Sequence, residues 1–161
     1  MPVQVARLNH AVLYVRDLDR SVAFYQAAFG FEEISRMGNQ MAFLRAAGST
    51  NHHDLGLMAV GANAPRPPRG ATVLYHLAWE VAAIEDLATA SVQLSETGAL
   101  VGASDHGATK SLYGVDPDGN EFELMWLVPR DQWGRYEHEA IVVPLDIERE
   151  VARFGAPSGA R

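Results

Sequence analysis

The chain has 161 residues and a formal net charge of −7, and it contains no cysteine. Disulfide bonds and thiolate metal sites are therefore excluded. The acidic balance and scattered basic residues argue against binding to nucleic acid or to an anionic membrane. No apolar run approaches the ~20 residues of a membrane span, and the N-terminal MPVQVARLNH lacks the pattern of a signal peptide. We therefore expect a cytoplasmic protein.

The first half of the chain predicts a strand, a helix and three further strands. Residues 8–15 are rich in Val, Leu and Tyr, which is typical of a strand. RSVAFYQAAFG, residues 20–30, has apolar residues at helical spacing and ends at a glycine. Asp17 or Asp19 can cap this helix. The Gly-Asn pair in MGNQ predicts a hairpin turn between the first two of the later strands, which we expect at 31–36, 40–46 and 53–60.

The second half predicts the same order of elements. ANAPRPPRG, residues 62–70, is rich in proline and glycine and predicts a linker. After it we expect a strand, a helix and three strands at 73–81, 84–97, 99–102, 110–115 and 121–128. A tail follows, in which we expect a short helix at 145–154 and a disordered end, APSGAR.

The two halves resemble one another in sequence. LNHAVLYV and LYHLAWEV both begin with Leu, a variable residue and His, and the two histidines, His10 and His76, are 66 residues apart. Such a repeat indicates two copies of one supersecondary unit. We therefore predict an α+β fold of two βαβββ modules, whose curved mixed sheets form a funnel around a metal site. The predicted parts are modules at 1–61 and 73–128, a linker at 62–72 and a tail at 129–161.

His10 and His76 occupy equivalent positions of the repeat, which makes them candidate metal ligands. A single histidine on an apolar strand is more often a core residue bonded to a carbonyl, but two at equivalent positions make coincidence less credible. In NEFELMWL, Glu123 alternates with Phe122, Leu124 and Trp126 and so lies on the opposite face of the strand. Glu123 alone reads as a surface residue. Together, two imidazoles and one carboxylate form the facial triad of non-haem Fe(II) oxygenases.

The segment NHHDLGL, residues 51–57, places two histidines side by side. If it is a strand, His52 and His53 point to opposite faces, and only one of them faces the interior. The alternation alone does not select between them.

YHLAWEV, NHHDLGL and DHGATKSLYGVDPDGNEFELMW together resemble the vicinal oxygen chelate superfamily, which unites glyoxalases, bleomycin resistance proteins and dioxygenases. They are most similar to the extradiol dioxygenases of the catechol 2,3-dioxygenase type, over roughly residues 6–128. The resemblance implies Fe(II), with Mn(II) as the alternative, bound by His10, His76 and Glu123. It implies a small aromatic diol and O₂ as substrates, and a homodimer or higher oligomer.

The resemblance also implies catalytic roles for three further residues. His53 would be an acid–base group facing the funnel, with His52 facing away. Tyr113 would hydrogen-bond a substrate oxygen, and His106 would hold the substrate anion. Considered alone, Tyr113 reads as a packed aromatic residue, and His106 and His138 read as surface residues.

Other members of the superfamily supply the alternatives. Glyoxalase- or epimerase-like isomerases use a fourth protein ligand, which would lie near Gly56 or Leu57, and Asp54 is the carboxylate nearest to that place. Metal-dependent thiol transferases use a comparable triad. Antibiotic-binding members hold no metal and typically lack the triad.

Overall fold

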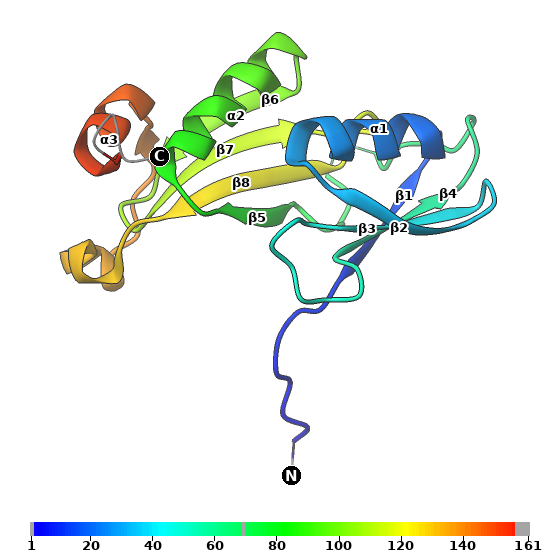
Figure 1. Ribbon diagram of the computed structural model, residues 1–161, viewed down its shortest axis with the longest axis horizontal. Coiled ribbons are helices and arrows are strands. Elements are labelled where there is room, and N and C mark those ends of the chain that lie inside the picture. Colours follow the sequence, from blue (N-terminus) through cyan, green and yellow to red (C-terminus); the bar gives the residue numbers. More distant parts are fainter. Residues whose placement is uncertain (1, 69, 157–161) are drawn as a thin grey trace. The chain divides into compact units, whose positions relative to one another are not determined.

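The structure is a computed structural model that describes residues 2–68 and 70–156 (Figure 1). The chain divides into two compact units, Met1–Arg69 and Gly70–Arg161. In the first unit the sheet has the strand order β1-β4-β3-β2, with β1 parallel to β4 and the other neighbours antiparallel. Its elements are β1 (Ala11–Val15), α1 (Leu18–Phe29), β2 (Glu32–Met37), β3 (Met41–Arg45) and β4 (Leu55–Ala59).

The second unit repeats this topology and extends it by one strand. Its sheet has the order β5-β8-β7-β6-β9, again with a single parallel pair, β5 with β8. The repeat and the α+β fold with two mixed sheets are confirmed. The elements up to the tail are β5 (Leu77–Val81), α2 (Ile84–Glu96), β6 (Leu100–Asp105), β7 (Thr109–Val115) and β8 (Glu121–Leu127).

Local chemistry fixes the ends of α1. The Asp17 carboxylate accepts a hydrogen bond from the Arg20 N–H at 3.0 Å, which satisfies one of the free donors of the first turn. Gly30 ends the helix with φ 64°, a left-handed conformation that costs glycine little. The helix buries Leu18, Ser21, Val22 and Tyr25, of which Val22 and Tyr25 belong to the apolar spacing predicted within residues 20–30.

The core of the second unit lies between its sheet and α2, which covers one face of that sheet (Figure 1). Phe122, Leu124 and Trp126 of β8 are buried on this face, whereas Glu123 and Met125 alternate with them and are half-buried. The predicted alternation along NEFELMWL is therefore confirmed. It leaves Glu123 on the face of the sheet that α2 does not cover.

Three strands begin two to four residues later than their sequences predict. β1 starts at Ala11, β5 at Leu77 and β4 at Leu55, so His10 and His76 each directly precede a strand. The segment before β4 is bent because the Asp54 carboxylate accepts hydrogen bonds from the Ala46 N–H, the Ser49 hydroxyl and the Asn51 amide.

This bend overturns the alternation argument for the histidine pair. His52 and His53 lie outside the strand, and their Nδ1 atoms are 3.1 Å apart. Their rings meet edge to face and do not point to opposite faces of a sheet.

The tail carries more structure than the sequence indicates. The predicted helix at 145–154 is α3 (Ile147–Phe154), and the Asp146 carboxylate caps it by accepting from the Arg149 N–H. A short strand, β9 (Val143–Pro144), adds to the edge strand β6, and two 3₁₀ turns, Arg130–Gln132 and Gly134–Glu137, precede it. Of the predicted disordered end APSGAR, residues 157–161 lie outside the described residues.

No helix within residues 2–68 and 70–156 is long and apolar enough to cross a bilayer.

Candidate metal centre and its neighbours

His76 and Glu123 face each other in the second unit, where His76 directly precedes β5 and Glu123 lies in the neighbouring strand β8. β5 and β8 are parallel neighbours. The pairing of Ala78 with Glu123 brings the first residues of β5 beside the middle of β8. His76 Nε2 lies 3.0 Å from Glu123 Oε2. The two side chains are 25% and 14% exposed, so they are accessible to a ligand while largely removed from bulk water.

This pair has the properties of two ligands of one divalent cation. Donor atoms at right angles with bonds of about 2.1 Å are about 3.0 Å apart, which is the observed separation of nitrogen and oxygen. His76 Nδ1 is buried and has no hydrogen-bond partner among the residues that the structure describes. The donor types and their separation therefore fit a metal ion.

Tyr113 and His106 extend this pair into a line of polar contacts. Tyr113 of β7 stands opposite Glu123 in the antiparallel register, and its hydroxyl donates to Glu123 Oε1 at 3.3 Å. The same hydroxyl lies 2.8 Å from His106 Nε2. Burial and the charge of Glu123 raise the pKa of Tyr113, so its hydroxyl keeps its proton at neutral pH.

The proton positions in this line follow from a backbone contact. His106 Nδ1 lies 3.1 Å from the Ile141 carbonyl, which can only accept, so Nδ1 carries a proton. In neutral His106, Nε2 is then an acceptor for the Tyr113 hydroxyl. The single hydroxyl proton has two acceptors, His106 Nε2 and Glu123 Oε1, and the shorter contact is to His106. Tyr113 can thus pass a proton between a histidine and a candidate metal ligand.

In the first unit, His53 lies against His10. Their ring centroids are 4.4 Å apart, and the centroid of the Phe43 ring lies 5.0 Å from that of His53. Burial, followed by the neighbouring imidazoles of His10 and His52, lowers the pKa of His53. His53 is therefore the more enclosed member of the pair that the sequence left open, and it contacts the candidate ligand His10.

The position of a fourth ligand is closed. The three hydrogen bonds that Asp54 accepts engage both of its carboxylate oxygens, and the residue is buried. A side chain at Gly56 would meet Met41 Cε at 3.1 Å and Val12 Cγ2 at 3.2 Å. Neither position offers a free carboxylate to a metal.

The structure brings together His76, Glu123, Tyr113 and His106 in one unit, and His10 with His53 in the other. Within the described ranges, 2–68 and 70–156, no three His, Asp or Glu side chains form a group that could hold a metal. The complete triad therefore stays a prediction. His138, predicted to be solvated, is exposed at the end of the second 3₁₀ turn.

Sequence reasoning missed the contribution of the tail. The contact between the Ile141 carbonyl and His106 Nδ1 could not be predicted, because a backbone carbonyl is present at every residue. Lys110, Asp105 and Glu150 form a buried ionic cluster, for which the one sign in the sequence was a lysine at the start of a predicted strand, 110–115. Asp105 lies beyond the strand predicted at 99–102, because β6 extends to Asp105.

Comparison with known proteins agrees with this fold. A profile of the Glyoxalase/Bleomycin resistance protein/Dioxygenase superfamily matches residues 7–124. Catechol-2,3-dioxygenase of Bacillus subtilis is 34% identical over 131 residues, which cover 80% of this chain and 44% of that protein. A manganese-dependent 2,3-dihydroxybiphenyl 1,2-dioxygenase of Geobacillus genomosp. 3 is 30% identical over 134 residues, or 81% of this chain and 39% of that protein.

A solved structure shares the fold at lower identity. The fosfomycin resistance protein FosX of Listeria monocytogenes, complexed with Mn(II) and sulfate, has a TM-score of 0.62 and 23% identity, covering 83% of this chain and 99% of that one. The chain spans less than half the length of the two dioxygenases.

Proposed function

Because the chain belongs to the Glyoxalase/Bleomycin resistance protein/Dioxygenase superfamily, we propose that it is a metal-dependent extradiol ring-cleaving dioxygenase. Its substrates are a small catechol-type aromatic diol and O₂. The observation that supports this function best is the line of contacts His106–Tyr113–Glu123–His76. In this line two acid–base groups, His106 and Tyr113, lie next to two candidate metal ligands, Glu123 and His76. The two dioxygenase relatives support the same reaction class.

His10, His76 and Glu123 hold the metal in this proposal. Fe(II) is the expected ion and Mn(II) the alternative, since the same ligand set accepts both. A divalent ion held by these residues would supply positive charge that favours deprotonation of the diol.

The chain's own residues bind the substrate and move protons. Tyr113 keeps its proton and can donate a hydrogen bond to a substrate oxygen. His106 accepts from the Tyr113 hydroxyl and, when protonated, stabilises negative charge through it. His53, beside His10, accepts a proton from the diol and returns it when the ring opens.

The rival functions of the superfamily fit the contacts less well. A four-ligand isomerase needs a carboxylate or amide near Gly56, where a side chain would crowd Met41 and Val12 and force them to shift. A thiol transferase shares the metal triad but has no use for the Tyr113–His106 pair. A metal-free binding protein has no use for the His76–Glu123 pair.

The test is reconstitution of the protein with Fe(II) under anaerobic conditions, followed by addition of catechol or 3-methylcatechol in air. We expect oxygen uptake and a yellow ring-fission product. His10→Ala, His76→Ala and Glu123→Ala should each abolish both signals. His138→Ala is the matched control, because His138 is exposed and lies in the tail, and it should retain full activity.

Two outcomes would redirect the proposal. Metal binding without a product from any diol would favour an isomerase or thiol transferase. The absence of metal binding would favour a small-molecule binding protein. Retention of full activity by His53→Ala would remove His53 from the acid–base role and leave the rest of the proposal standing.

A further inference from the structure

The tail, residues 129–156, holds the loop that carries His106. β9 pairs with β6 so that Val143 stands opposite Asp105, and this register carries the Ile141 carbonyl to His106 Nδ1. The Tyr136 ring lies directly against Gly107. A Cβ at Gly107 would fall 2.4 Å from Tyr136 Cγ, so the ring occupies the place of a side chain. The tail thus contacts both the ring of His106 and the backbone that follows it.

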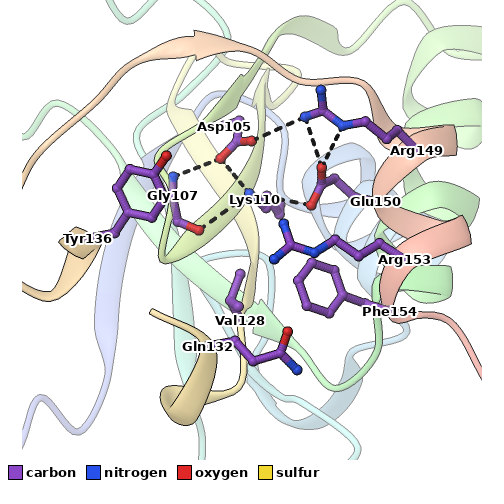
Figure 2. A pocket seen from close by; sticks show the side chains of 10 residues that line it. All are labelled: Asp105, Gly107, Lys110, Val128, Gln132, Tyr136, Arg149, Glu150, Arg153 and Phe154. Atoms are coloured by element: carbon purple, nitrogen blue, oxygen red, sulfur yellow. Dashed lines mark hydrogen bonds and ion pairs between the residues drawn. The ribbon is translucent and has the colours of Figure 1, made fainter. Parts of the chain in front are cut away.

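A buried ionic cluster ties α3 to the same loop, as Figure 2 shows. Lys110 of β7 contacts Asp105 Oδ1 at 2.5 Å, the Gly107 carbonyl at 3.3 Å and Glu150 Oε2 at 3.5 Å. Asp105 Oδ1 also accepts from the Gly107 N–H at 2.7 Å. Glu150, on α3, is 1% exposed. Lys110 is therefore a junction between the loop and α3.

Arg149 closes the outer side of this cluster. Its guanidinium lies 2.9 Å from Glu150 Oε1 and 3.7 Å from Asp105 Oδ2. Removing one partner from a buried ionic group leaves the remaining charges without compensation. Lys110 contacts both Glu150 and the carbonyl of Gly107, one residue from His106, so these contacts connect α3 to the backbone beside His106.

We propose that the tail is a positioning device for His106. The Ile141 carbonyl selects the Nδ1–H tautomer, and the Glu150–Lys110–Asp105 cluster keeps tail and loop in contact. Only this tautomer, when neutral, presents Nε2 as an acceptor to the Tyr113 hydroxyl. Ile141 and Glu150 are positioning residues, since they act through His106, and their importance for catalysis rests on the proposed function.

The tautomer can be measured in the full-length, metal-free protein by ¹⁵N NMR of the histidine side chains. We expect wild-type His106 to carry its proton on Nδ1, although histidine free in water favours Nε2–H. Glu150→Gln keeps the shape of the side chain and removes its charge. In this variant we expect the His106 signal to move toward a mixture of tautomers. Glu148→Gln, an exposed change on the same helix, should leave it unchanged.

A second variant tests the carbonyl directly. Semisynthesis that replaces the amide between Ile141 and Val142 by an ester weakens the Ile141 carbonyl as an acceptor. The same shift toward a mixture of tautomers is expected, without any change in the ionic cluster.

An Nε2–H tautomer in the wild type would overturn the proposal, as would a folded Glu150→Gln protein with an unaltered His106 signal. The NMR measurement needs no metal, substrate or turnover. A chain with the expected tautomer but without dioxygenase activity would therefore refute the proposed function and leave the positioning role intact. With activity, Glu150→Gln should lower kcat about tenfold with little change in KM, and Glu148→Gln should change neither.

Discussion

In the second unit, side chains that can donate or accept a proton contact a candidate metal ligand. Tyr113 is the central one, because its hydroxyl is shared between His106 and Glu123. In the sequence alone, a tyrosine ten residues before a glutamate does not predict that the two side chains meet. Antiparallel pairing of β7 with β8 sets Tyr113 opposite Glu123 and gives the spacing its meaning.

Tyr113→Phe removes this shared hydroxyl and leaves the ring in place. We expect the variant to bind metal as the wild type does and to lose about 10²-fold in kcat, the lower end for a proton-transfer group. Metal content by elemental analysis and steady-state kinetics with catechol separate these two effects. Equal loss of metal and activity would instead make Tyr113 a support for Glu123.

Asp54 is a structural carboxylate beside His53. Burial raises its pKa, but the hydrogen bonds from Ser49, the Ala46 N–H and Asn51 outweigh this and leave the pKa below its ordinary value of 3.8. Its stabilising contribution is therefore complete above the unfolded-state pKa and is lost as the pH falls through the folded-state pKa.

Asp54→Asn should lower the free energy of unfolding at pH 7 by about 1–3 kcal/mol, because a buried acceptor network is broken. The difference from wild type should shrink as the pH falls below about 4. Urea unfolding at several pH values measures it. A difference that is constant with pH would show that the charge of Asp54 contributes nothing.

At the scale of elements, the two helices that follow the repeated first strands differ in how they start. Asp17 caps α1, whereas Ala83 precedes α2 in an extended conformation and offers no side-chain hydrogen bond. The first turn of α2 therefore lacks the side-chain cap that stabilises the first turn of α1.

Ala83→Ser should stabilise the protein by about 0.5–1 kcal/mol, since serine is a preferred N-cap residue. Thermal unfolding should show a rise in Tm of about 1–4 °C. Ala82→Ser, one residue earlier, is the control and should change Tm little. Equal rises in both variants would argue against capping.

The loop between β6 and β7 depends on Gly107 for two reasons. Its φ of 80° disfavours any residue with a side chain, and the Tyr136 ring fills the space that a Cβ needs. Gly134 shares only the first feature, with φ 53° and nothing within 4 Å of an added Cβ.

Gly134→Ala should therefore cost about 1–2 kcal/mol from backbone strain alone. Gly107→Ala should cost about 1–3 kcal/mol more, from the clash with Tyr136. Chemical denaturation of the two variants measures the difference. If both substitutions lowered the free energy of unfolding equally, Tyr136 and the tail would move aside without cost. This result would contradict the proposed positioning role of the tail.

At the scale of the whole molecule, the proposed function requires a metal that binds residues of both units. His10 belongs to the first unit, and His76 and Glu123 belong to the second. A metal that binds only the folded chain stabilises it by mass action, by about 2.7 kcal/mol at 100 times the dissociation constant.

We expect Mn(II) to raise Tm in the wild type, and the rise to be lost in His10→Ala as fully as in Glu123→Ala. Differential scanning calorimetry with and without a chelator measures this. A normal rise in His10→Ala would confine the metal to the second unit and remove His10 from the ligand set.

The sequence by itself determined the repeated βαβββ order and the buried face of β8. Both follow from local rules, since apolar periodicity and glycine or aspartate at helix ends act over a few residues. It also indicated His76 and Glu123, because the repeat and the alternation point to them independently. Tertiary structure decided where the strands begin, because the Asp54 hydrogen bonds bend the segment before β4.

Tertiary structure also decided the contacts of the tail. The contact of the Ile141 carbonyl with His106 and the contact of Glu150 with Lys110 join residues 35 and 40 positions apart. No local pattern encodes such contacts, because they arise only when packed elements bring a carbonyl or a charge to a partner that would otherwise be buried without one.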